Sequence, residues 1–85
     1  MFYIYAIYNS KCQRIYIGQT YDLEKRLKEH NDLNNLTHTY TRRFGSGWKL
    51  IYKEEVSTRI EALKREKQLK SYQGRLFIKN LTKVV

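Results

Sequence analysis

The sequence holds 85 residues, of which 41% are hydrophobic, and 17 Lys and Arg against 8 Asp and Glu give it a formal charge of +9. This length predicts a single domain over residues 1–85 with a thin core, and the composition excludes a disordered chain. One cysteine and two histidines exclude a zinc finger and a disulfide framework, and no apolar run approaches the roughly 18 residues of a membrane span.

Two extended runs open the chain. Residues 2–8 (FYIYAIY) are continuously apolar and aromatic, which is typical of a strand packed on both faces. Residues 9–12 (NSKC) predict a turn, and residues 13–19 (QRIYIGQ) predict a second strand. A hairpin closed by this loop places Tyr8 across from Gln13.

The tyrosines of this hairpin fall on one face. In the register above, Tyr5 lies directly opposite Tyr16. Gly18 falls near Tyr3, where a missing side chain lets a backbone or a ligand approach. Each buried phenol needs a hydrogen-bond partner. These hydroxyls are therefore either satisfied at the edge of a core or part of a site.

A helix, a loop and a third strand are predicted next. Asp22 is placed to cap a helix over residues 22–31. Residues 32–47 are polar, end in Gly-Ser-Gly and predict a loop. Residues 48–55 (WKLIYKEE) alternate between apolar and polar side chains, as a strand does.

Two further helices complete the chain. Ser57 or Thr58 is expected to cap the first, which runs to about Tyr72 and ends before Gly74. Residues 75–82 are expected to form a short last helix. The predicted elements therefore follow the order β-β-α-β-α-α.

Polar side chains stand where apolar ones are expected on both longer helices. Arg26 and His30 share one stripe with Leu23 and Leu27. Glu66 lies in the middle of the apolar face of the later helix. A buried unpaired charge is unfavourable, so each group needs a partner, water or a metal. A salt bridge between Arg26 and Glu66, and a backbone hydrogen bond for His30, are the structural alternatives to a functional site.

Together these residue types suit phosphodiester hydrolysis. That reaction needs an activated water, a cation over the phosphate and a carboxylate that holds a divalent metal. A phenol near a metal or an arginine can have its pKa lowered enough to act as a base. Arginine binds phosphate oxygens bidentately. The candidate catalytic residues are therefore Tyr5, Tyr16, Arg26, His30 and Glu66, and Glu66 is also the candidate metal ligand.

The net charge indicates the same class of partner. A charge of +9 predicts a polyanion, nucleic acid rather than a membrane surface, although a basic composition also serves solubility. Arg42 and Arg43 suit contacts to backbone phosphates or form a solvated basic pair, and Lys67 and Lys70 are further candidates for binding nucleic acid. The lone Cys12 fits a reducing compartment, so we expect a cytoplasmic protein. We also expect a monomer or a weak homodimer.

Four segments of the chain occur in an order that belongs to a known family. Residues 3–5 (YIY) stand where the first signature tripeptide belongs, with Tyr3 in place of its glycine, and residues 16–18 (YIG) are the second signature unaltered. Residues 18–31 look like the family's helix with its arginine and histidine, and residues 61–70 look like the segment with its metal-binding glutamate. In these features the chain resembles the GIY-YIG nuclease superfamily, in particular its small single-domain bacterial members.

The resemblance implies a fold and a mechanism. The fold is a small three-stranded antiparallel sheet flanked by helices, an α+β class. One divalent ion, Mg²⁺ or Mn²⁺, is held by Glu66. Tyr5 and Tyr16 surround the attacking water, Arg26 contacts the scissile phosphate, and His30 lies nearby.

The implied activity is that of an endonuclease, with divalent-metal-dependent hydrolysis of phosphodiester bonds in DNA rather than RNA, in repair or recombination. Asn80 loosely matches an asparagine that some members use. Larger members append DNA-binding modules that set specificity, and this sequence shows none. The alternative is a non-catalytic nucleic-acid-binding module with the same fold.

Overall fold

Three strands and three helices make up the part of the chain that the structure, a computed structural model, describes: residues 1–32 and 43–82. The elements are β1 (Phe2–Asn9), β2 (Arg14–Thr20), α1 (Leu23–Asn31), β3 (Trp48–Val56), α3 (Arg59–Lys70) and α4 (Tyr72–Thr82). The expected α+β class and the order β-β-α-β-α-α are confirmed. No helix within these described ranges is long and apolar enough to cross a membrane.

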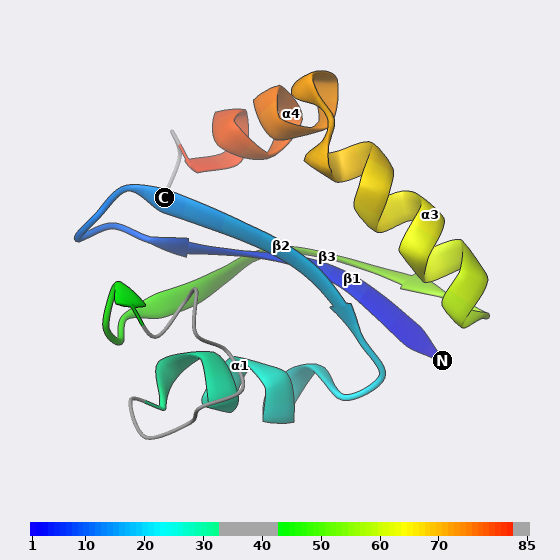
Figure 1. The fold of residues 1–85 in the computed structure, drawn as a ribbon, viewed down its shortest axis with the longest axis horizontal. Helices are drawn as coiled ribbons and strands as arrows, with labels where there is room; N and C mark the ends of the chain where they lie inside the picture. The colour runs from blue at the N-terminus through cyan, green and yellow to red at the C-terminus, as the bar shows by residue number, and fades with distance from the viewer. Residues whose placement is uncertain (33–42, 83–85) are drawn as a thin grey trace.

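The sheet lies between two layers of helix. Its strands are antiparallel in the order β2-β1-β3, with α1 on one face and α3 and α4 on the other (Figure 1). The central strand β1 is covered on both faces, which explains its continuous apolar sequence.

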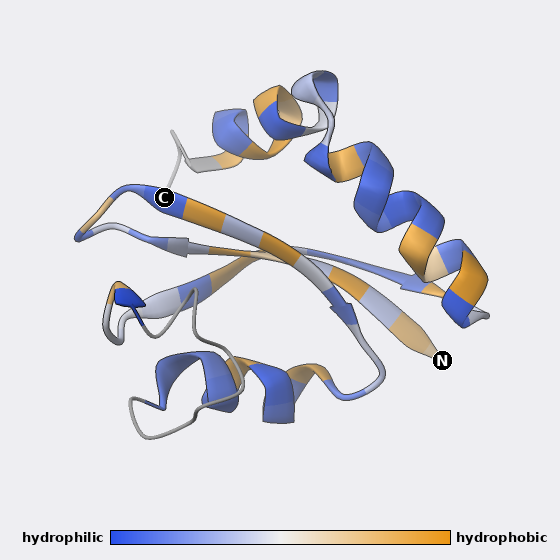
Figure 2. Cartoon of the chain, in the orientation of Figure 1, coloured by the Kyte–Doolittle hydropathy of each residue, from blue (hydrophilic) through white to orange (hydrophobic). Residues whose placement is uncertain are grey.

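Each face of the sheet carries its own apolar cluster. On the side of α3 and α4, apolar segments of these helices and of the strands (Figure 2) pack together in one cluster. The buried members of this cluster are Ile4, Ala6, Ile17, Ala62, Leu69 and Ile78. The cluster on the α1 side is smaller, and its buried members are Tyr5, Ile7 and Trp48. Tyr5 therefore belongs to the thinner and more polar side of the sheet.

The register of the β1–β2 hairpin differs from the expected one. Tyr5 pairs with Gly18, and Tyr16 pairs with Ile7, so the prediction that the two tyrosines lie directly opposite is wrong by two residues. The pairing extends to Asn9, so the loop begins one residue later than expected. Because side chains alternate with a period of two, a shift of two leaves both tyrosines on one face.

Asn9 explains the later start of the loop. Its side chain is fully buried, accepts a hydrogen bond from the backbone N–H of Lys11 at 3.0 Å and donates one to the carbonyl of Ser46 at 3.2 Å. These bonds hold Asn9 within the sheet. At the other end of the loop, Gln13 adopts a φ of 55°, in the left-handed region, and turns the chain into β2.

The caps of α1 and α3 follow the sequence signals. The Asp22 carboxylate accepts a hydrogen bond from the backbone N–H of Lys25 at 3.2 Å. Of the two candidates for the second cap, Thr58 is the one that caps α3. Its hydroxyl accepts from the N–H of Glu61, and the Glu61 carboxylate accepts from the N–H of Ser57, each at 3.2 Å.

The corner between α3 and α4 differs from the expected one. Helix α3 ends at Lys70 rather than near Tyr72, and α4 begins at Tyr72 rather than at residue 75. Gly74 therefore lies inside the first turn of α4. A side chain at this position would overlap the backbone of Leu69, so the glycine allows two helices to meet at a sharp corner.

Candidate active site

Gly18 makes room for two tyrosine rings. A Cβ atom on Gly18 would lie 2.8 Å from the hydroxyl oxygen of Tyr5 and 3.1 Å from Cε1 of Tyr16. Because no side chain occupies this space, the two rings approach with centroids 6.4 Å apart and planes tilted by 40°. The glycine of the second signature thus lies opposite Tyr5, not near Tyr3 as expected. Its lack of a side chain leaves space for the two phenol rings.

His30 contacts both tyrosines. Its Nε2 atom lies 2.7 Å from the Tyr5 hydroxyl oxygen, and both side chains are buried, each with 1% exposure. The His30 ring centroid is 4.9 Å from that of Tyr16 and 5.7 Å from that of Tyr5. Helix α1 therefore brings the histidine of its polar stripe directly onto the tyrosine pair.

The two charged candidates, Arg26 and Glu66, also affect the pKa of the Tyr5 hydroxyl. Burial raises its pKa well above the usual value for tyrosine, and the nearby Tyr16 and Glu66 raise it further. Arg26 acts in the opposite direction, through its charge and through hydrogen bonding. All five candidate catalytic residues therefore act on or around one hydroxyl group, which keeps its proton at neutral pH in the unliganded protein.

The two charged candidates do not pair with each other. Arg26 Nε lies 3.4 Å from Oε1 of Glu29 within α1, and Lys70 Nζ lies 3.1 Å from Oε2 of Glu66 within α3. The two helices lie on opposite faces of the sheet (Figure 1). The alternative of an Arg26–Glu66 salt bridge joining two helices is therefore wrong. Both side chains are partly exposed, at 31% for Arg26 and 20% for Glu66.

The donor set around Glu66 fits a hard divalent cation completed by other ligands. In the described ranges, no group of three or more His, Cys, Asp or Glu side chains is placed to hold a metal. Glu66 contributes a single, mostly covered carboxylate whose charge raises the pKa of Tyr5. Mg²⁺ is commonly bound through one or two carboxylates, with water and substrate phosphate filling the remaining positions. A single glutamate is therefore compatible with this ion or with Mn²⁺.

The basic candidates lie on the outer surface. Lys67 and Lys70 are exposed on α3 and, with Lys64, line a shallow groove. Arg43 is exposed at the entry to β3. Arg42 lies outside the described residues. The lysines follow one another at three-residue intervals, so they form a ridge along the helix.

Asn31 is a site-building residue that sequence reasoning missed. Its amide nitrogen donates to the carbonyls of Leu27 at 3.3 Å and Trp48 at 3.0 Å. Its amide oxygen accepts from the backbone N–H groups of Gly47 at 2.9 Å and Trp48 at 2.8 Å. These bonds tie the end of α1, and with it the adjacent His30, to the start of β3. The signal in the sequence was an asparagine at the end of a helix, which is too common to single out.

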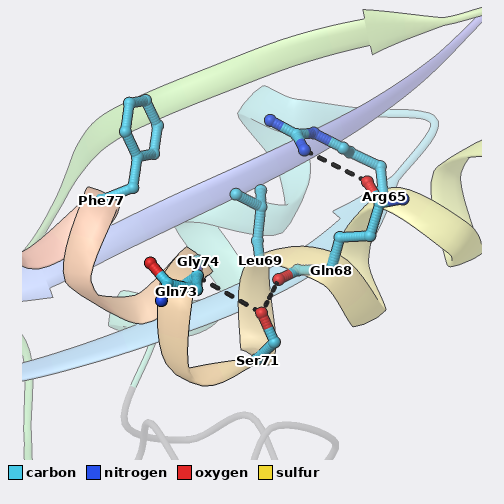
Figure 3. A pocket seen from close by; sticks show the side chains of 7 residues that line it. All are labelled: Arg65, Gln68, Leu69, Ser71, Gln73, Gly74 and Phe77. Carbon is cyan, nitrogen blue, oxygen red and sulfur yellow. Dashed lines mark hydrogen bonds between the residues drawn. The ribbon is translucent and has the colours of Figure 1, made fainter.

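A second hollow lies at the corner of α3 and α4, away from the tyrosines. Its lining residues, drawn in Figure 3, are Arg65, Gln68, Leu69, Ser71, Gln73, Gly74 and Phe77. Arg65 Nε binds both carboxylate oxygens of Glu54 on β3, at 2.8 and 3.1 Å, and the same carboxylate accepts a hydrogen bond from Tyr52. This cation is thus engaged with the sheet. The hollow contains none of the five candidate catalytic residues.

Comparison with known proteins places the chain in a family. Residues 1–80 match the model of the GIY-YIG catalytic domain. The UPF0213 protein SSP2268 of Staphylococcus saprophyticus is 38% identical over 72 residues, which cover 82% of this chain and 80% of the relative.

Other staphylococcal relatives give the same result. The UPF0213 proteins SERP0126 of Staphylococcus epidermidis and SA0446 of Staphylococcus aureus are each 35% identical over 68 residues, 78% of this chain and 79% of the relative. The names of these relatives state no activity, and no solved structure matches the chain. On the extent of the domain match, this chain belongs to the GIY-YIG catalytic domain family.

Proposed function

We propose that this protein is a divalent-metal-dependent endonuclease that hydrolyses phosphodiester bonds in DNA. Membership of a catalytic domain family indicates a nuclease-type function that acts on nucleic acid. The observation that carries the proposal is the grouping of the five candidate side chains around one group, the hydroxyl of Tyr5 itself. They are the residue types that phosphodiester hydrolysis needs, and they come from β1, β2, α1 and α3.

Each residue has a role that its surroundings support. The Tyr5 hydroxyl, protonated in the unliganded protein, can donate a hydrogen bond to the attacking water or to a phosphate oxygen, and His30 orients it. Tyr16 lies across the gap left by Gly18 and contacts the same water. Arg26 is exposed enough to reach the scissile phosphate, where its planar guanidinium binds two oxygens. Such positioning lowers the barrier by fixing the reacting atoms before the reaction.

Glu66 holds the metal in this mechanism. A bound Mg²⁺ or Mn²⁺ supplies Lewis acidity toward the phosphate oxygens. The carboxylate on α3 would hold the ion, with water and substrate phosphate as its other ligands. Lys67, Lys70 and Arg43 bind phosphates away from the cleavage point and orient the duplex without reading its sequence.

A plasmid-nicking assay tests the proposal. Supercoiled DNA is incubated with the full chain in Mg²⁺, in Mn²⁺ and in EDTA, and relaxed product is quantified on a gel. We expect product with either ion and none in EDTA. A preparation that shifts DNA on a native gel but nicks no DNA or RNA in either ion would establish the non-catalytic binding module instead.

Substitution of Arg26 by lysine should impair cleavage much more than folding. Lysine keeps the positive charge but not the flat bidentate contact to phosphate, so we expect the cleavage rate to fall about tenfold or more. The existing ion-pair partner is the partly exposed Glu29, a pair of small energetic value, and lysine can still donate a hydrogen bond to the Tyr5 hydroxyl, so the melting temperature should hardly change. Arg59→Lys, an exposed arginine at the start of α3, is the matched control and should cleave normally. An unchanged rate for Arg26→Lys would show that Arg26 is not a phosphate clamp.

Binding to duplex DNA should be mainly electrostatic. If about four to six phosphates are contacted, the logarithm of the affinity falls with the logarithm of the salt concentration at a slope of roughly −4 to −5. Lys67→Met should reduce the magnitude of that slope by about 1 and weaken binding to unrelated sequences equally. Fluorescence anisotropy at several salt concentrations measures both quantities. A flat dependence would contradict the assignment of the basic surface.

A further inference from the structure

The candidate metal ligand has a cation within its own helix. Lys70 Nζ lies 3.1 Å from Oε2 of Glu66, four residues earlier in α3. A glutamate that precedes a lysine by four residues is in the favourable orientation for such a pair. The side chain of Lys70 is 42% exposed and that of Glu66 is 20% exposed. The ammonium group therefore approaches the carboxylate from the solvent side.

The same carboxylate cannot serve the ammonium group and a divalent ion equally well. The ammonium group donates a hydrogen bond to Oε2, one of the two carboxylate oxygens that a metal could use as a ligand. Two like charges a few ångströms apart also repel each other, and the repulsion doubles when one of them is divalent. Lys70 in its observed position therefore competes with metal binding at Glu66.

Lys70 also belongs to the basic ridge of α3. Together with Lys64 and Lys67 it lines the outer groove, and among the described residues neither of these two lysines forms an ion pair with an acidic side chain. A nucleic-acid backbone laid along this ridge offers the Lys70 ammonium group a phosphate in place of Glu66. The flexible four-carbon stem of lysine lets the ammonium group move from the carboxylate to a phosphate without a change in the backbone.

We propose that Lys70 couples metal binding to nucleic-acid binding: it occupies the Glu66 carboxylate in the free protein and leaves it for a phosphate when nucleic acid is bound. The proposal rests on the function proposed above, in which Glu66 holds the metal. It makes the site a poor metal binder until substrate arrives. Because linkage is reciprocal, metal bound at Glu66 also releases Lys70 and strengthens nucleic-acid binding.

The first experiment measures Mn²⁺ binding to the full chain without nucleic acid, by calorimetry or electron paramagnetic resonance. Lys70→Met should bind Mn²⁺ about fivefold or more tightly than wild type. Lys67→Met removes the same charge from the same helix without a contact to Glu66, and its Mn²⁺ affinity should stay within about twofold of wild type. Glu66→Gln in the Lys70→Met background should abolish the gain. Equal effects of Lys70→Met and Lys67→Met would overturn the proposal.

The second experiment uses a duplex oligonucleotide in EDTA, so that it does not depend on any metal. Glu66→Gln should tighten duplex binding about twofold in the wild-type background, because it frees Lys70, and hardly at all in the Lys70→Met background. Additive effects of the two substitutions would overturn the exchange of Lys70 between carboxylate and phosphate. If Glu66→Gln left Mn²⁺ binding unchanged while the duplex effects were non-additive, the metal role of Glu66 would fail and the exchange would stand.

Discussion

Tyr5→Phe and Tyr16→Phe should each lower the rate of DNA cleavage by about 10²-fold or more, as expected when a group that handles the attacking water loses its hydroxyl. The double variant should lose less than the product of the two single effects, because both hydroxyls serve one water. Single-turnover rates at saturating protein measure the effect on the chemical step without that on binding.

The two single variants should differ in stability. Tyr5→Phe removes a buried hydrogen bond of 2.7 Å to His30, which lowers the free energy of unfolding by about 1 kcal/mol or more. Tyr16 is only half-buried, so its variant should be closer to wild type. Tyr8→Phe, on the same strand but on the opposite face, is the matched control and should cleave at the normal rate. If both single variants cleave normally at equal folded fraction, the tyrosine pair serves packing alone.

The side of the sheet that holds the tyrosines could be predicted from the sequence, whereas their register could not. Alternation in a strand places Tyr5 and Tyr16 on one face for any even shift of the hairpin. The shift itself depends on Asn9, whose buried side chain binds Ser46 in a segment 37 residues away. An inference made from the turn residues alone cannot include this long-range contact. The register matters for the candidate site, because it places Gly18 opposite Tyr5.

The helix caps could be predicted because they depend only on residues that are close in the sequence. The Asp22 and Thr58 caps are made by groups within three residues of each other, so their signals are local. Gly74 carries a local signal too, but an ambiguous one. A glycine after a helical pattern usually closes that helix. Here the neighbouring backbone of Leu69 leaves no space for a side chain, so the glycine opens the next helix instead.

In the candidate site, too, local features could be predicted from the sequence and long-range contacts could not. Helical periodicity identifies Arg26, His30 and Glu66 as polar groups on apolar faces and predicts that each needs a partner. It does not identify the partner. His30 reaches Tyr5 across the fold, whereas the two charged residues form ion pairs within their own helices. The alternative of a long-range salt bridge failed because the sheet lies between α1 and α3, and each charged side chain pairs within its own helix instead.

Glu66→Gln should abolish metal-dependent cleavage while the protein stays folded. Glutamine keeps the volume and part of the hydrogen bonding, but it removes the charge that a hard divalent cation requires. Within the described ranges this carboxylate pairs only with the half-exposed Lys70, a contact worth about 0.3–0.5 kcal/mol. The melting temperature should therefore fall by no more than about 4 °C. Duplex binding in EDTA should tighten about twofold, because the loss of the carboxylate frees Lys70.

A substitution of a second glutamate in α3 is the control that distinguishes loss of the metal ligand from loss of stability. Glu61 accepts the capping bond from Ser57, and Glu61→Gln weakens that bond without changing the surroundings of the tyrosines. It should lower the melting temperature about as much as Glu66→Gln does and still cleave DNA at close to the wild-type rate. Melting temperature, nicking rate and duplex affinity are measured on the same preparations. If the Glu66→Gln protein is folded, binds DNA and cuts at the wild-type rate, Glu66 is not a metal ligand. The cation that the reaction needs would then have to be bound by other residues.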